Sequence, residues 1–398
     1  MAGRVFVGIV PTKRHKERNT DMSYPSNVSN KTLVIGGGVH AAIFAASWVR
    51  AGGEKPIIAE KTSRTGGVFS RLMPFAMNSA NLSSLDSAGT GPSRMPRRSA
   101  ADDLNYLPNS AYQVSTIAKG EYPSSQEMAD IVRSTLQEYS DVYVNCDLTI
   151  ESNGESIYRA DTGEYLGSPA RVIWAAGLYM PDNGNYAGSP SVVTAEAFLS
   201  TRDGETGRFM DRQYAGRKIA VVGNGDTAAT IIEYLLGQGL SKPTTMADDI
   251  DWYGGSVMPM TKKSWAMTYH ARYITIARHM PERKVYGVIN PIPERGRITP
   301  AGTTSYVNGR TYDLVIDATG FQALTPSFDY SYDVNSNSTA NVIARRTYDN
   351  SLYLIGAAAG ISGNNVYNSK FAAARLAIYQ LAPITAEFAT QLYRQYNG

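Results

Sequence analysis

Two segments of the chain carry glycines at a spacing that could bind a phosphate group. In the first, a short β-branched run ends at Gly36, and an apolar pattern of helical period begins directly after it. Gly36, Gly38 and Ala41, with Gly37 between the first two, fit the pattern G-x-G-x-x-[G/A]. Gly36 would permit a tight turn from strand to helix, Gly38 would leave room for a pyrophosphate, and Ala41 would let the helix pack against the strand. The amides at the start of the helix would then face the anion.

A carboxylate follows the first glycine motif at the distance that a ribose would need. Residues 56–60 (PIIAE) predict a second strand, which ends in Glu60. An acidic residue about 20 positions after the glycines accepts hydrogen bonds from an adenosine ribose. The predicted site also includes the next residue, Lys61, and the glycine pair Gly66 and Gly67 shortly after it.

The second glycine segment repeats this arrangement later in the chain. Residues 217–222 predict a strand, a G-x-G-x-x-A pattern follows, and an amphipathic helix then runs to Gly237. A single pattern of this kind also occurs in ordinary turns between strands and helices, but two of them, each between a strand and a helix, are much more specific. The predicted binding residues here are Gly223, Asn224, Gly225, Asp226, Thr227 and Ala228.

The strand after the second motif ends without a carboxylate. Residues 250–253 lead into a Gly-Gly-Ser turn, and Lys262 and Lys263 stand a little further on. An acid at this place would suit NAD, whereas nearby cations suit the 2′-phosphate of NADP. The segment therefore favours NADPH, with NADH as the alternative, and it leaves open that the two lysines form a solvated face.

Three further segments each read as an apolar strand that ends in small residues and glycine. They cover residues 171–177, 313–321 and 351–360. An alanine-rich terminal helix is predicted over residues 370–381. The residues from these segments that we include in the predicted binding sites are Gly177, Thr319, Gly320 and Gly356.

Composition narrows the class of protein. The 398 residues suggest two domains, and 43% hydrophobic residues allow a sizeable core. A net charge of +3 gives no reason to expect a nucleic-acid partner. One cysteine, Cys146, excludes a disulfide framework and a CxxC pair, and the four histidines lack the spacing of metal ligands, so no metal is expected. The longest apolar stretch, residues 41–49, is too short to span a membrane, so we expect a cytoplasmic protein without membrane contact.

The order of these segments resembles the two-dinucleotide-binding-domain flavoprotein superfamily. The likeness covers roughly residues 31–383 and rests on the two glycine motifs, Glu60 and the Asp317-Ala-Thr-Gly segment. It implies FAD at the first motif and NADPH at the second. It also implies an α/β fold of two Rossmann-like, three-layer domains, with the NADPH domain inserted into the FAD domain. The expected division is a loose N-terminal arm (1–30), a discontinuous FAD domain (31–190 and 310–398) and an NADPH domain (191–309).

Within that superfamily the sequence combines two styles. The segment from Gly223 to Ala229 resembles the NADPH motif of thioredoxin-reductase-like enzymes, but those enzymes use a CxxC pair that one cysteine cannot supply. They also usually carry a Gly-Asp pair near the C-terminus, and here Gly356 is followed by alanine. These departures look more like class B flavin monooxygenases, nearest in style to the lysine/ornithine N-hydroxylases. The Phe-x-Gly-x-x-x-His-x-x-x-Tyr fingerprint of other monooxygenase branches is missing.

The resemblance implies a single-component monooxygenase that acts on a small-molecule amine or aromatic metabolite. NADPH would reduce FAD, and reduced flavin with O2 would give a C4a-(hydro)peroxide. Asn78 resembles the asparagine that such enzymes place near the flavin ring and is the predicted catalytic residue, with an ordinary loop asparagine as the alternative. A flavin-dependent halogenase of the same build, a non-oxygenating NADPH-dependent reductase and a nucleotide-binding module without catalysis stay open. The expected partners are a small-molecule substrate and O2, and the sequence is compatible with a homo-oligomer.

Overall fold

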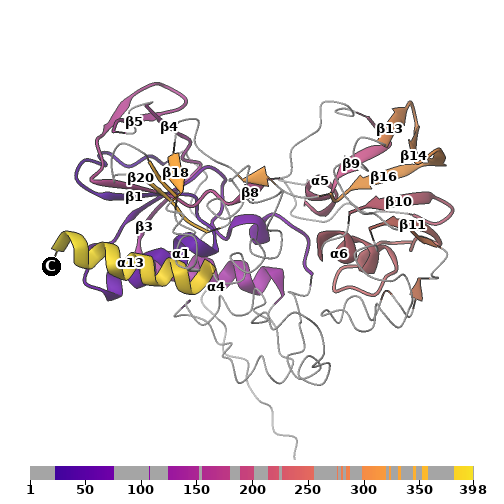
Figure 1. Ribbon diagram of the computed structural model, residues 1–398, viewed down its shortest axis with the longest axis horizontal. Helices are drawn as coiled ribbons and strands as arrows, with labels where there is room; N and C mark the ends of the chain where they lie inside the picture. Colours follow the sequence, from indigo (N-terminus) through magenta and orange to yellow (C-terminus); the bar gives the residue numbers. More distant parts are fainter. Residues whose placement is uncertain are drawn as a thin grey trace, which may run out of the picture.

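Two lobes, each built around its own sheet, make up the described part of the chain (Figure 1). Among the helices of this part, none is long and apolar enough to cross a membrane. The computed structural model describes residues 23–75, 107, 124–151, 155–179, 189–200, 214–223, 226–254, 276, 279–280, 284–286, 298–319, 322–323, 330–332, 344–346, 352–356 and 381–397.

The first lobe is built on a seven-stranded sheet whose central strands are parallel. Its inner strands are largely apolar and buried because both faces of the sheet are covered. An antiparallel pair extends one edge. In spatial order the strands are β18 (Tyr330–Tyr332), β19 (Ala344–Arg346), β20 (Leu352–Leu354), β7 (Arg171–Trp174), β1 (Thr32–Ile35), β2 (Ile57–Glu60) and β3 (Asp141–Val144).

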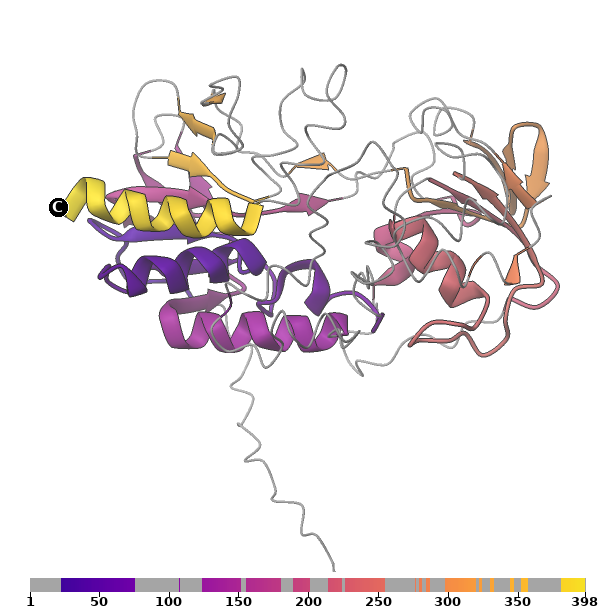
Figure 2. The same ribbon diagram turned by 60° about the horizontal axis from the view of Figure 1, so that its bottom comes forward.

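Three helices cover one face of this sheet: α1 (Val39–Arg50), α4 (Ser125–Tyr139) and α13 (Leu381–Asn397) (Figures 1 and 2). Four alanines of α1 are buried, and their small side chains let this helix lie close to the sheet and to its two neighbours. The α4 helix begins with a capping box, in which Ser124 and Glu127 each accept a hydrogen bond from the other's backbone amide.

The opposite face of the first sheet carries a small antiparallel sheet. Its strands are β4 (Leu148–Ile150), β5 (Ile157–Arg159) and β6 (Tyr165–Gly167). Side chains from both sheets, among them Leu33, Ile57, Ile157 and Leu166, form one buried apolar cluster. The lobe therefore has three layers, with helices below its central sheet and strands above it in the view of Figure 1.

The second lobe repeats this plan around a five-stranded parallel sheet. Helices α5 (Ala195–Leu199) and α6 (Asp226–Leu235) pack on one face through an apolar core, and a three-stranded antiparallel meander covers the other. The parallel strands are, in spatial order, β12 (Val285–Tyr286), β11 (Asp249–Tyr253), β10 (Lys218–Val222), β16 (Leu314–Asp317) and β9 (Val192–Thr194). The meander consists of β13 (Ile298–Ala301), β14 (Thr304–Val307) and β15 (Arg310–Tyr312).

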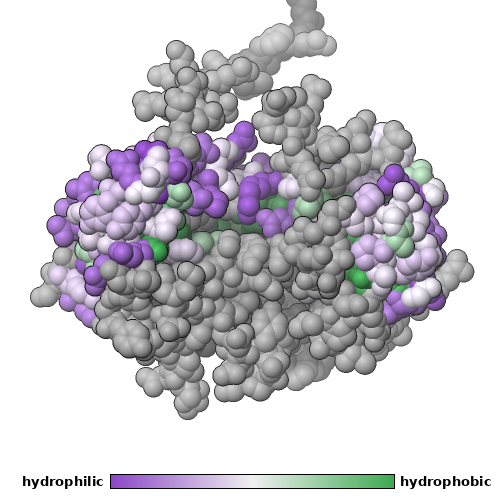
Figure 3. Space-filling model, turned by 90° about the horizontal axis from the view of Figure 1, so that it is seen from above, coloured by the Kyte–Doolittle hydropathy of each residue, from purple (hydrophilic) through white to green (hydrophobic). Residues whose placement is uncertain are grey.

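Two short connections join the lobes. Antiparallel strands β8 (Leu178–Tyr179) and β17 (Gln322–Ala323) form one of them. The other follows the 3-10 helix η1 (Gly67–Ser70): the Met73 amide donates to the Leu199 carbonyl over 2.7 Å. Met73 is buried in the core of the second lobe. Seen from above (Figure 3), the described surface of both lobes is mostly polar, and apolar residues show in the strip between them.

Most strands around the two glycine motifs lie where the sequence predicted them. The exceptions concern later residues. The terminal helix runs over Leu381–Asn397, which the sequence did not predict, whereas the predicted helix over 370–381 lies almost wholly outside the described residues. Strand β15 pairs with β14 in the meander and β16 pairs with β10 in the second sheet, so both strands belong to the second lobe, although the sequence predicted a return to the first domain at residue 310. The remaining domain boundaries stay predictions.

Candidate functional site

The first glycine motif forms a tight turn at the carboxyl end of β1. Gly36 has a φ of +102°, and a Cβ there would lie 2.7 Å from the Ala175 carbonyl oxygen, so only glycine fits. Gly38 is different: its φ is −93°, and a Cβ would meet only the Gly67 Cα at 3.7 Å. The surrounding protein therefore does not require glycine at position 38. A ligand that approaches the backbone there would require it.

The start of α1 is open to an anion. Gly38 is its N-cap residue and has no side chain to cap the amides of the first turn. The predicted glycine pair lies against the turn, because the Gly66 amide donates to the Gly37 carbonyl over 2.8 Å. Both glycines of this pair have a positive φ. Gly37, Gly38, Gly66 and Gly67 thus come together as the sequence suggested, and a pyrophosphate fits the uncapped amides.

Glu60 ends β2 next to this turn and is buried. Its Oε2 accepts a hydrogen bond from the Gly37 amide over 2.7 Å. Its Oε1 accepts from the Thr62 amide and hydroxyl over 2.8 and 2.7 Å. Each carboxylate oxygen has two lone pairs, so acceptor capacity is left for a ribose hydroxyl. Lys61, by contrast, is exposed and forms an ion pair with Asp147 over 2.8 Å.

The ends of two further strands complete this edge of the first sheet. Gly177, just beyond β7, has a φ of +75° and open space where a Cβ would be. Gly356, just beyond β20, has a φ of +67°, and a Cβ would lie 2.6 Å from the His40 ring. His40 belongs to the first turn of α1, and its Nδ1 lies 3.1 Å from the Thr385 hydroxyl on α13. The terminal helix α13 therefore contacts His40, the residue that packs against the turn at Gly356.

His40 predicts a measurable pH dependence. Burial lowers its pKa from 6.5 to about 4, so the imidazole is neutral at pH 7. Between pH 6.5 and about 4 the unfolded chain binds a proton here that the folded protein does not bind, so this residue makes stability fall as the pH falls through that window. Replacing His40 by Gln should remove about 2 kcal/mol of the loss between pH 7 and pH 4.5 in urea unfolding. Equal slopes of stability against pH in His40→Gln and in the parent protein would contradict the assignment.

The second motif forms a similar turn at the carboxyl end of β10. Gly223 has a φ of +145°, and a Cβ there would lie only 2.1 Å from the Ala318 carbonyl oxygen. The Trp252 indole N–H donates to the Gly223 carbonyl over 2.8 Å, and both are buried. A Cβ at Gly254 would lie 1.6 Å from the same carbonyl oxygen. The turn is thus fixed by its two neighbouring strands.

The remaining described residues of the second predicted site have structural roles. Ala228 is fully buried and lets α6 pack against the sheet. Thr319 follows β16, and both its amide and its hydroxyl donate to the buried Asp317 carboxylate over 3.0 and 2.6 Å. Thr227 lies in the first turn of α6.

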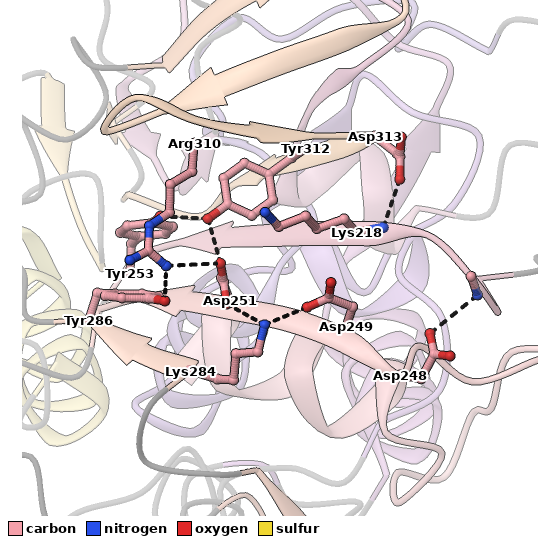
Figure 4. Close-up of polar contacts among 11 residues, drawn as sticks. Lys218, Asp248, Asp249, Asp251, Tyr253, Lys284, Tyr286, Arg310, Tyr312 and Asp313 are labelled. Atoms are coloured by element: carbon pink, nitrogen blue, oxygen red, sulfur yellow. Dashed lines mark hydrogen bonds and ion pairs between the residues drawn. The ribbon is translucent and has the colours of Figure 1, made fainter.

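A buried polar network lies on the meander side of the second sheet (Figure 4). Burial raises the pKa values of Tyr253 and Tyr312, so both hydroxyls keep their protons. Tyr312 donates to Asp251 Oδ2 over 2.6 Å, and the Tyr253 hydroxyl, 2.6 Å from the Tyr312 oxygen, donates to it in turn. The Lys284 ammonium lies 3.2 Å from Asp251 Oδ1, too poorly directed for a hydrogen bond, and Arg310 reaches to 3.8 Å from Oδ2.

Most of the predicted site residues that the structure describes therefore lie at these two sheet edges. The residues of the polar network were not all predicted from the sequence. Sequence analysis missed His40, Asp251 and Arg310. The alternating pattern of residues 249–253 is the signal that could have placed Asp251 and Tyr253 on one face of the sheet. The predicted residues Asn78, Asn224, Gly225, Lys262, Lys263 and Gly320, and the side chain of Asp226, lie outside the described part.

Within the described ranges, no group of three or more histidine, cysteine, aspartate or glutamate side chains is arranged to hold a metal ion. The donors that gather at the two sheet edges are backbone amides, hydroxyls and single carboxylates. This donor set suits phosphates and ribose hydroxyls.

Comparison with known proteins places the fold. No protein-family model and no curated protein matches the sequence. A doubly substituted flavin monooxygenase from Stenotrophomonas maltophilia superposes with a TM-score of 0.54, at 17% identity over 92% of this chain and 98% of that one. The bacillithiol disulfide reductase of Bacillus cereus superposes with a TM-score of 0.50, at 13% identity over 92% and 99% of the two chains. At these identities the likeness is one of fold, and it confirms the predicted α/β fold with Rossmann-like parallel sheets.

Proposed function

We propose that the protein is an FAD- and NADPH-dependent oxidoreductase that oxygenates a small-molecule amine or aromatic metabolite. FAD would bind at the edge of the first sheet and NADPH at the edge of the second. When bound, FAD would supply the redox chemistry, taking a hydride from NADPH and passing electrons to O2. The chain's own residues would hold the two nucleotides and keep water from the reacting rings.

One observation carries this proposal: a single chain has two glycine turns, each at the carboxyl end of the central strand of its own parallel sheet. Ligands of open α/β sheets bind at this edge. Gly36 and Gly223 lie where a Cβ would strike a backbone carbonyl of the neighbouring strand. A Cβ at Gly38 would make only an ordinary contact with the Gly67 Cα at 3.7 Å, so the protein leaves room there that a bound pyrophosphate would use.

The only cysteine supports oxygenation over thiol chemistry. Cys146 is buried in the apolar cluster between β2 and the β4–β6 sheet. Burial raises the pKa of its thiol to about 12, whereas a reactive cysteine needs a lowered pKa and access to solvent. Reduction of disulfides through a cysteine pair is therefore closed to this chain, although the second superposed structure is a disulfide reductase.

The described residues suggest how the first nucleotide would be held. The amides at the start of α1 would bind the pyrophosphate, and the remaining lone pair of Glu60 Oε2 would accept from the ribose. His40 is neutral at pH 7, so it adds no positive charge beside the helix start. Asn78 is proposed to hydrogen-bond the flavin ring or the nicotinamide with a neutral amide.

The proposal is tested on the purified full-length protein. We expect it to carry flavin, to lose the flavin absorbance when NADPH is added without air, and to consume O2 faster when an amine or arene substrate is present. Mixing the reduced protein with O2 should give a long-lived absorbance band that differs from both oxidised and reduced flavin. Asn78→Ala should shorten the lifetime of that band without loss of bound flavin.

Other outcomes would favour the alternatives. Immediate return to the oxidised spectrum, with fast ferricyanide reduction and no oxygenated product, would favour the non-oxygenating reductase. Oxygenase activity that requires halide and yields a halogenated arene would favour the halogenase. A flavin that NADPH cannot reduce would rule out the monooxygenase, the reductase and the halogenase, and would leave a nucleotide-binding module.

A further inference from the structure

The hairpin between β14 and β15 lies at the edge of the second sheet where a nucleotide would bind. The parallel pairing puts Gly223, Tyr253 and Tyr286 side by side at the carboxyl ends of β10, β11 and β12. Arg310 opens β15, and its guanidinium lies 4.5 Å from the centre of the Tyr286 ring. In Figure 4 this arginine and the two tyrosines lie at the end toward which the strand arrows point.

These side chains form a flat, layered surface. The Tyr253 and Tyr286 rings stack with centroids 4.8 Å apart at an interplanar angle of 20°. Arg310 covers the outer ring and also donates a hydrogen bond to the Tyr286 hydroxyl. A planar guanidinium above a ring keeps its edge donors available to an anion.

The charged side chains around this surface differ in their exposure to solvent. Lys284 lies within ion-pair distance of both the partly exposed Asp249 and the buried Asp251, so the two carboxylates share one ammonium. Arg310 is the outer member, with half of its side chain exposed, and it lies 3.8 Å from the buried Asp251. The carboxylate holds the arginine from behind and leaves its outer face positive.

The exposed face of Arg310 lies near the place where the ribose of a bound dinucleotide would be expected. A pyrophosphate at the glycine turn of β10 would place the adenosine ribose beyond the end of β11, next to Tyr286. A carboxylate at that point would repel a 2′-phosphate, but the two acids of β11 point into the sheet–meander layer and are paired. Gly254, which follows β11, cannot hold a side chain without striking Gly223.

We propose that Arg310 recognises the 2′-phosphate of the nicotinamide dinucleotide and so sets the preference for NADPH over NADH. The inference rests on the proposed binding of a dinucleotide at the second sheet. Tyr286 and Asp251 act as positioning residues that hold the guanidinium at the sheet edge. The site would belong to the meander.

The test measures binding of two non-reacting probes to the full-length, flavin-loaded protein by calorimetry. The probe 2′,5′-ADP carries the 2′-phosphate, and 5′-AMP lacks it. Arg310→Gln should raise the Kd of 2′,5′-ADP about tenfold or more, as expected for the loss of a charged hydrogen bond, and change the Kd of 5′-AMP less than about twofold. Tyr286→Phe, which keeps the ring but loses the hydroxyl, should have a smaller effect of the same selectivity.

A matched control comes from the opposite edge of the same sheet. Arg217, which is exposed just before β10, should be replaceable by Gln with no change in either Kd. Equal weakening of both probes by Arg310→Gln, or no change in either, would overturn the proposal, with thermal melting used to verify folding. If the parent protein binds none of the four molecules (2′,5′-ADP, 5′-AMP, NADPH and NADH), the proposed function fails instead.

Discussion

Gly223→Ala should abolish reduction of the flavin by NADPH while the flavin itself stays bound. The new Cβ would lie 2.1 Å from the carbonyl oxygen and 2.5 Å from the carbonyl carbon of Ala318, and backbone atoms cannot rotate away as a flexible side chain can. The turn at the end of β10 must then open, which displaces the amides that would face the pyrophosphate. We expect NADPH-dependent loss of flavin absorbance to slow on the order of 100-fold, about 2.7 kcal/mol.

Two matched glycine variants make this result specific. Gly36→Ala, whose Cβ would lie 2.7 Å from the Ala175 carbonyl oxygen, should have the reverse outcome, so that the protein loses flavin during purification. Gly216→Ala introduces a positive-φ alanine (φ +72°) into open space and should cost only about 1 kcal/mol of stability with no change in flavin reduction. An unchanged reduction rate in Gly223→Ala would refute nucleotide binding at this turn.

The two glycine turns could be predicted from the sequence because they are local. A strand, a glycine at positive φ and a helix follow one another within about 20 residues, so spacing alone encodes the turn. Glu60 was found in the same way, since it ends the next strand. Its three hydrogen bonds to Gly37 and Thr62 could not be predicted in detail, but the residues that make them are also neighbours of the motif.

The features that the sequence did not yield depend on contacts between distant residues. His40 meets Thr385, 345 positions later, on a helix that was not predicted from the sequence and whose first turn contains Pro383. Residues 314–317 join the second sheet because β16 pairs with β10, nearly 100 positions earlier, and nothing local in the sequence marks this pairing. Such pairings follow from sheet topology, which propensity and spacing do not specify.

Asp251 shows how a local pattern can hide a role. In residues 249–253 alternate side chains point to opposite faces, so Ile250 and Trp252 enter the core beneath the helices. Asp251 and Tyr253 then face the meander, and the carboxylate becomes useful only because Tyr312 and Lys284 meet it there. The sequence shows that β11 does not end in an acidic residue. It does not show which residues pair with Asp251 inside the strand.

Replacing Asp251 by Ala should therefore cost more stability than any exposed aspartate of the second lobe. The change leaves the buried Tyr312 hydroxyl without its acceptor and removes the carboxylate that faces Lys284 and Arg310. An unsatisfied buried donor costs about 1–3 kcal/mol, and breaking a buried ion pair costs about 3–5 kcal/mol. Because Lys284 is partly exposed and keeps Asp249, we expect a loss of about 2–4 kcal/mol in urea unfolding at pH 7.

The control is an aspartate of the same lobe that also accepts a backbone hydrogen bond but lies in solvent. Asp313 accepts from the Lys218 amide over 2.7 Å, and Asp313→Ala should cost about 1 kcal/mol. Asp251→Asn keeps an oxygen for Tyr312 and should fall between the two alanine variants. A double variant with Tyr312→Phe should lose less than the sum of its parts, because the phenylalanine no longer presents an unsatisfied hydroxyl. If Asp251→Ala unfolds no more easily than Asp313→Ala, the buried carboxylate does not anchor the meander to the sheet.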